Sequence, residues 1–81
     1  MIIIQRYIDE YLIVNDNLFF TCEEMAEYFN MPLYIYNNLN IQYGARKVEM
    51  EFWVFKNEES AEQFLNSPEL EPYLIMLKLT E

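Results

Sequence analysis

Residues 20–32 read FTCEEMAEYFNMP and carry the strongest structural signal of the chain. Thr21 and, three residues later, Glu24 form the pattern of a capping box, in which each side chain accepts a hydrogen bond from the other residue's backbone. Pro32 prevents a simple continuation of the helix that starts there, because proline lacks a backbone N–H and clashes with the preceding turn. We therefore predict a helix from this cap to about Asn30.

Strand-like patterns lie on both sides of this helix. Residues 33–41 and 48–55 alternate along the chain in the two-residue period of a β-strand. Residues 2–14 read as an extended opening segment with one interruption, and the Asn-Asp-Asn sequence at residues 15–17 then predicts a turn. An apolar run at residues 74–80 predicts the last strand.

The order of these elements predicts the fold class. A second helix is expected from residue 58 to about residue 66, because Asn57 is a favoured N-cap residue. The resulting order, β-α-β-β-α-β, is that of a ferredoxin-like α+β domain, an antiparallel sheet with two helices on one face. We expect one domain over residues 1–81. Because the first 19 residues exceed the length of one strand, an extra N-terminal hairpin is the alternative.

The charge of the chain limits its partners. Fourteen acidic side chains oppose five basic ones and there is no histidine, so the formal net charge is −9, while 53% of the residues are hydrophobic. Such a chain folds and presents a negative surface. Direct binding to DNA or RNA is not expected, because that affinity comes largely from lysine and arginine. A basic protein that itself binds nucleic acid is the expected partner.

A partner-binding surface is predicted on the sheet face that the helices leave open. Tyrosine and tryptophan are enriched at protein interfaces, and carboxylates two residues apart on a strand lie roughly 6.5–7 Å apart, close to the spacing of successive phosphates. Glu23 and Glu27 add charge from the outer face of the first helix. The residues expected on the open face are Tyr34, Tyr36, Glu49, Glu51, Trp53 and Phe55.

Two plainer interpretations stay open for these residues. The aromatic side chains could simply shield the sheet, and the carboxylates could simply keep the surface solvated. A further use of the open face is self-association, so a homodimer is also a possible assembly.

Enzyme, metal and cofactor functions are not expected. Without histidine, an activated nucleophile needs another base, and Glu23 and Glu24 oppose the formation of a thiolate at Cys22. Residues 15–17 lack the alternating ligands and the glycine of a calcium loop. The single cysteine suits a reducing cytoplasm, and no apolar run is long enough to span a membrane. We expect a cytoplasmic protein.

Two local resemblances add to this interpretation. Residues 21–32 resemble the first helix and turn of helix-turn-helix proteins, but residues 33–36 are strand-like and contain no basic residue for phosphate contacts. Residues 53–73 resemble the strand and helix of dimeric α+β barrel proteins, which implies a dimer through the open sheet face. The catalytic or haem-binding histidine of that family has no counterpart here, so no activity carries over.

The whole profile, very short, acidic, aromatic and rich in Asn, Ile and Tyr, resembles the small host-takeover and anti-CRISPR proteins of bacteriophages. That resemblance implies a non-enzymatic inhibitor, acting in the host cytoplasm, that occupies the basic nucleic-acid-binding surface of a host protein. The alternative is the small dimeric α+β barrel.

Overall fold

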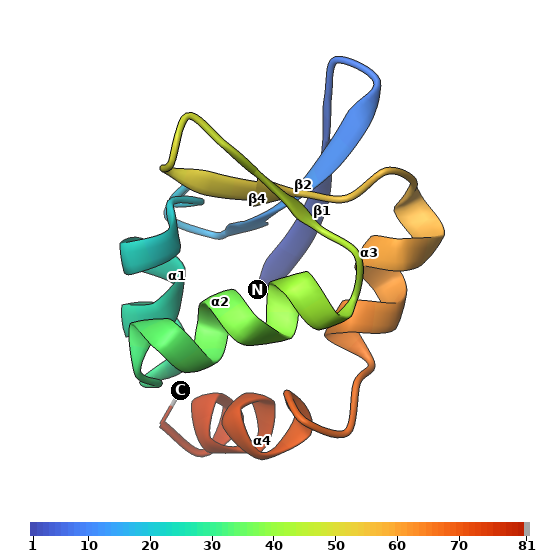
Figure 1. Cartoon of the computed structure of the whole chain (residues 1–81). Helices are drawn as coiled ribbons and strands as arrows, with labels where there is room; N and C mark the ends of the chain where they lie inside the picture. Colours follow the sequence, from blue (N-terminus) through green and yellow to red (C-terminus); the bar gives the residue numbers. More distant parts are fainter. Residues whose placement is uncertain (81) are drawn as a thin grey trace.

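A computed structural model describes residues 1–80 of the chain. A β-hairpin comes first, two helices follow, and a second β-hairpin leads into two further helices (Figure 1). The elements in chain order are β1 (Ile2–Tyr7), β2 (Glu10–Asn15), α1 (Cys22–Phe29), α2 (Leu33–Gln42), β3 (Arg46–Val48), β4 (Phe52–Val54), α3 (Glu58–Leu65) and α4 (Glu71–Thr80).

The two hairpins are joined at a single position. β1 pairs with β2 antiparallel, with Ile2 opposite Asn15, and β3 pairs with β4 in the same sense. Between the hairpins, Tyr11 and Phe55 exchange two backbone hydrogen bonds of 2.9 and 2.7 Å. This bridge sets β4 beside β2, so the two short sheets offer a shared face to the helices.

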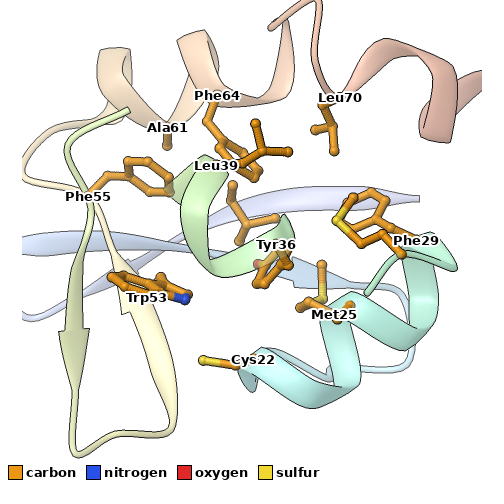
Figure 2. Close-up of a cluster of buried hydrophobic side chains, with 13 residues drawn as sticks. Cys22, Met25, Phe29, Tyr36, Leu39, Trp53, Phe55, Ala61, Phe64 and Leu70 are labelled. Carbon is orange, nitrogen blue, oxygen red and sulfur yellow. The ribbon is translucent and has the colours of Figure 1, made fainter. Parts of the chain in front are cut away.

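The main hydrophobic core fills the space between that face and the helices (Figure 2). Phe64 of α3 contacts three other rings, those of Phe55, Tyr36 and Tyr43, at centroid distances of 5.5, 6.2 and 6.1 Å. Burial of a side chain of this size contributes roughly 1.5–3 kcal/mol. The buried members are Ile13, Cys22, Met25, Ala26, Phe29, Met31, Tyr36, Leu39, Trp53, Phe55, Ala61, Phe64 and Leu70.

A second, smaller cluster lies on the opposite face of the strands. It consists of buried Leu12 and Val14 from β2 and buried Phe52 and Val54 from β4. Tyr7 packs against this cluster with its ring edge-on to Phe52, at a centroid distance of 5.4 Å. β2 and β4 therefore carry buried apolar side chains on both faces.

The first and third helices begin and end where their sequences predict. Thr21 caps α1 by accepting a 3.3 Å hydrogen bond from the backbone N–H of Glu24, whose side chain accepts one in return. Asn30 ends α1 in a left-handed conformation. Asn57 caps α3 through the backbone N–H of Ser60. These capping residues lie within three residues of the helix ends, and for this reason the sequence alone predicts where both helices begin and end.

Residues 33–41, predicted as a strand, belong to helix α2 instead. The buried side chains Tyr36, Leu39 and Asn40, with half-buried Tyr43, recur at the spacing of one helical face. The two-residue alternation in the same stretch is coincidental. Because α2 has no side-chain N-cap and is rich in residues of low helix propensity, packing against α1 and the strands determines its structure.

Two other predicted strands are wrong as well. Residues 48–55 contain a tight turn, so the expected long strand is the hairpin of β3 and β4. Residues 74–80 form most of α4. An apolar run of this length fits a buried strand or a helix equally well, and Pro72 lies in the first turn of α4, where proline is tolerated.

The α+β class and the N-terminal hairpin are confirmed, whereas the order of elements is β-β-α-α-β-β-α-α rather than β-α-β-β-α-β. Within residues 1–80, no helix has the length and apolar character that a membrane crossing requires.

Candidate functional site

The turn between β3 and β4 holds two residues, Glu49 and Met50, in an unusual backbone conformation. The backbone N–H of Glu51 donates a 2.9 Å hydrogen bond to the carbonyl of Val48 and closes the turn. Its central residues Glu49 and Met50 have φ angles of 51° and 59°. Such angles normally call for Asn or Gly, and other residues hold them at a cost on the order of 1 kcal/mol each. Met50 is 84% exposed.

This turn lies against the start of α1. The backbone N–H of Cys22 donates a 2.7 Å hydrogen bond to the carbonyl of Glu51, so the turn and the first residues of α1 are neighbours (Figure 1). Glu23, the residue after Cys22, is thereby brought to the same end of the molecule as Glu49 and Glu51 of the turn, and Glu27 lies one helical turn farther along α1. All four carboxylates are exposed, and among residues 1–80 none of them forms an ion pair. We call this surface the acidic end; it consists of Glu23, Glu27, Glu49 and Glu51.

One cation lies close to the acidic end. The ammonium group of Lys47 lies 5.4 Å from the centre of the Trp53 ring, a cation–π arrangement. It also lies near the thiol of Cys22. Lys47 therefore reduces the negative charge at the edge of this surface without pairing with one of its carboxylates.

An apolar groove adjoins the acidic end on the sheet face opposite the main core. It has a volume of about 290 Å³ and is lined by Tyr7, Leu12, Val14, Leu18, Phe20 and Gln5. Leu18 is 69% exposed and has a φ of 65°. Phe20 contacts Phe52, the residue after Glu51, at a centroid distance of 5.1 Å. Phe52 therefore connects the groove to the β3–β4 turn, because Glu51 of the turn precedes it directly in the chain.

Three of the residues predicted on the open sheet face are buried instead. Tyr36, Trp53 and Phe55 lie in the main core, and Trp53 is only 9% exposed. Its indole N–H donates a 2.8 Å hydrogen bond to Asn37 of α2. The alternation along β4 is as predicted, but the faces are reversed: Trp53 and Phe55 face the helices, because α2 packs against that side.

The other predicted residues divide into two groups. Glu49 and Glu51 lie in the β3–β4 turn, next to Glu23 at the start of α1, and Glu27 lies one helical turn farther along α1. Tyr34 is exposed on α2, which starts at the opposite end of α1 (Figure 1). Tyr34 is therefore not part of the same surface.

Sequence reasoning missed Leu18, Phe20 and Met50. For the first two a signal exists, because residues 18–20 are three consecutive apolar residues just before an N-cap, and such an exposed run usually has a functional reason. For Met50 there is none, since Glu-Met-Glu is not a turn sequence.

A second helix follows α1 where the sequence predicts a strand. Three residues, 30–32, connect α1 to α2, and the backbone N–H of Met31 bonds back to the carbonyl of Ala26. No residue of α2 is charged, so this helix supplies no phosphate-binding charge. Arg46, which follows α2, is held by Glu10 through a 2.7 Å hydrogen bond from its Nε and a second one from its Nη2.

The titratable groups with shifted pKa values serve the structure. Burial raises the pKa of the Cys22 thiol, which makes it a poor nucleophile. Hydrogen bonds from Tyr43 and Gln42 lower the pKa of Glu69 and tie the end of α2 to the segment before α4. Across residues 1–80, no three His, Cys, Asp or Glu side chains are grouped so that they could hold a metal ion.

Comparisons with other proteins add no family to this description. The chain matches no protein-family model, and comparisons with curated proteins and with solved structures found no match.

Proposed function

We propose that the protein is a non-catalytic inhibitor that binds the cationic, nucleic-acid-binding surface of another protein. Its contact surface is the acidic end together with the apolar groove. The observation that carries the proposal is the β3–β4 turn, where the nearly fully exposed Met50 lies between two unpaired carboxylates on a left-handed backbone.

The charge of the acidic end selects a cationic partner. Four unpaired carboxylates on a body of net charge −9 attract a positive surface over a distance and orient it during encounter. Proteins that bind DNA or RNA carry such surfaces, because lysine and arginine replace the counterions of phosphate. Glu49 and Glu51 lie in a turn and not on a strand, so their carboxylates do not have the strand spacing that resembles successive phosphates. The expected complementarity is therefore between the acidic end and a cationic patch as a whole.

The apolar part of the surface supplies the contact area. Leu18 and Phe20 are exposed side chains that line the groove, and Met50 is exposed on the β3–β4 turn. Monomeric proteins seldom expose grouped apolar side chains without a use. Methionine adapts its shape to a partner surface at small cost. Apolar contact at the centre with carboxylates at the rim is the usual arrangement of a protein interface.

The likeness in size and composition to bacteriophage inhibitors supports a nucleic-acid-handling protein of a host cell as the partner. The alternative of a dimeric α+β barrel is less well supported, because such a dimer pairs broad open sheets. Here each sheet has two strands, and helices cover one face of β2 and β4, so no broad open sheet is present among the described residues.

Capture followed by displacement tests the proposal. The immobilised protein is exposed to nuclease-treated bacterial lysate, retained proteins are purified, and their binding to labelled DNA and RNA is measured with and without the free inhibitor. We expect a retained protein that loses its nucleic acid when the inhibitor is added. The complex should weaken about tenfold from low to physiological salt, because charges are screened within about 8–10 Å.

A matched pair of variants assigns the effect to the acidic end. Glu49→Gln with Glu51→Gln should weaken displacement by about tenfold. Glu59→Gln with Glu62→Gln removes the same charge from the exposed face of α3 and should change it less than about threefold. Equal effects of both pairs, or retained proteins whose nucleic-acid binding is unaffected, would contradict the proposal.

A further inference from the structure

Helix α4 has an exposed apolar face that no other element covers. It lies at the edge of the molecule (Figure 1), and none of residues 71–79 is fully buried. Tyr73, Leu74 and Leu77 pack against the main core. On the outer side, Ile75 is 49% exposed and Leu79 is 74% exposed. A helix that is apolar on both sides normally buries both of them.

The charged residues of α4 have a spacing that suits pairing with itself. Glu71 and Lys78 are both exposed and seven residues apart, so they lie on the same side of the helix, about 10 Å apart along its axis. Ile75 lies between them along the axis and slightly to one side. In an antiparallel pair of helices, residues on the same flank of each helix face one another.

We propose that two copies of the chain associate through α4, with the helices antiparallel about a two-fold axis beside Ile75. Lys78 of one protomer then meets Glu71 of its partner, and the symmetry repeats this ion pair on the other side of the axis. Ile75 of the two copies fills the space between the ion pairs, and Leu79 extends the apolar contact beyond them.

The distribution of charge favours a second copy at this face. Two bodies of net charge −9 repel each other, so self-association is least unfavourable where the facing surfaces carry no net charge. α4 carries one glutamate and one lysine, both exposed on the same flank of the helix. The exposed surfaces of α1 and α3 carry only acidic charges, those of Glu23 and Glu27 and of Glu58, Glu59 and Glu62. The small contact area makes this a weak dimer.

Sedimentation equilibrium of the whole chain, from micromolar to millimolar concentration, tests the dimer. We expect a reversible monomer–dimer equilibrium that strengthens as salt rises, because salt screens the repulsion between the two bodies. The complex with a cationic protein weakens with salt, so the two associations can fail independently. Ile75→Glu should abolish dimerisation, and because Ile75 is half exposed this variant should keep the helical circular dichroism of the parent.

Charge reversal tests the pairing itself. Glu71→Lys and Lys78→Glu should each weaken the dimer about tenfold, since each replaces two attractions by two repulsions. The double variant should restore it. Glu62→Lys on α3 changes the net charge as Glu71→Lys does, and should not weaken the dimer. A chain that is monomeric throughout, a dimer insensitive to Ile75→Glu, or a double variant as weak as the single ones would overturn the proposal.

Discussion

Exposed apolar side chains on left-handed backbone recur at three turns of this small molecule. Ile8, Leu18 and Met50 have φ angles of 57°, 65° and 59°. Left-handed conformations are unfavourable for residues of this kind, and strain that persists in a folded protein is commonly found at functional positions. Two of the three, Leu18 and Met50, belong to the proposed contact surface.

These turns also show the limit of local sequence reasoning. The turn at residues 15–17 is readable because Asn and Asp bond to nearby backbone, and Asn15 does so with the N–H groups of Asn17 and Phe19. The β3–β4 turn cannot be predicted from the sequence, because it contains none of the residues that are typical of turns. Without a turn signal, residues 48–55 are predicted as one long strand instead of the β3–β4 hairpin.

Replacement of the strained pair should stabilise the fold and weaken function. In Glu49→Asn with Met50→Gly, both central residues suit the left-handed turn, so the free energy of unfolding should rise by about 1 kcal/mol. Chemical denaturation measures this. Displacement of nucleic acid from the captured partner should weaken in the same variant. A less stable variant, or one that inhibits as well as the parent, would contradict this account of the turn.

The ion pair between Glu10 and Arg46 predicts a pH-dependent contribution to stability. A hydrogen bond from Arg46 lowers the pKa of Glu10 in the folded state. Because the folded pKa lies below the unfolded one, the contribution is present at neutral pH and is lost as pH falls through the folded pKa. Glu10→Gln should therefore be less stable than the parent at pH 7, and the difference should shrink below about pH 4.

Thermal unfolding of both proteins across this pH range measures the difference. Glu59→Gln on the exposed face of α3 serves as the control and should track the parent. A difference between Glu10→Gln and the parent that grows toward acid pH would contradict the assigned role of the ion pair.

At the scale of elements, the helices differ in what determines their structure, either capping residues in their own sequence or packing against other elements. α1 and α3 carry caps in their own sequence and are predictable. α2 has none, and its low-propensity residues are helical because Tyr36, Leu39 and Asn40 are buried against other elements. The amide nitrogen of Asn40 bonds back to the carbonyl of Tyr36 within the helix at 2.8 Å. Interactions of this kind depend on the assembled core, which local sequence patterns do not reveal.

Two leucines of α2 distinguish the helix from the predicted strand. As a strand, residues 33–41 would place Leu33 and Leu39 on one face, whereas the helix buries Leu39 and leaves Leu33 39% exposed. Leu39→Ala should therefore lower the free energy of unfolding by about 2–5 kcal/mol, and Leu33→Ala by less than about 1 kcal/mol. Urea denaturation of both variants measures this, and equal losses would favour the strand.

At the scale of the whole molecule, the sequence predicted the fold class and the sign of the surface charge, but not the order of the elements. The α+β class follows from a mixture of capped helices and apolar alternation, and the negative surface follows from the net charge of −9. Which carboxylates come together depends on the Cys22–Glu51 hydrogen bond, a contact between segments about thirty residues apart. The acidic end therefore emerges only when α1 and the β3–β4 turn are in place.

The central claim is that the acidic end and the apolar groove contact a cationic protein. Hydrogen–deuterium exchange of the complex with the captured partner tests it most directly, because slowed exchange marks the backbone that the partner covers. We expect new protection at residues 18–23 and 48–52, with the amides of α3 and α4 unchanged. Protection confined to α2, α3 or α4, with the β3–β4 turn exchanging as in the free protein, would contradict the claim.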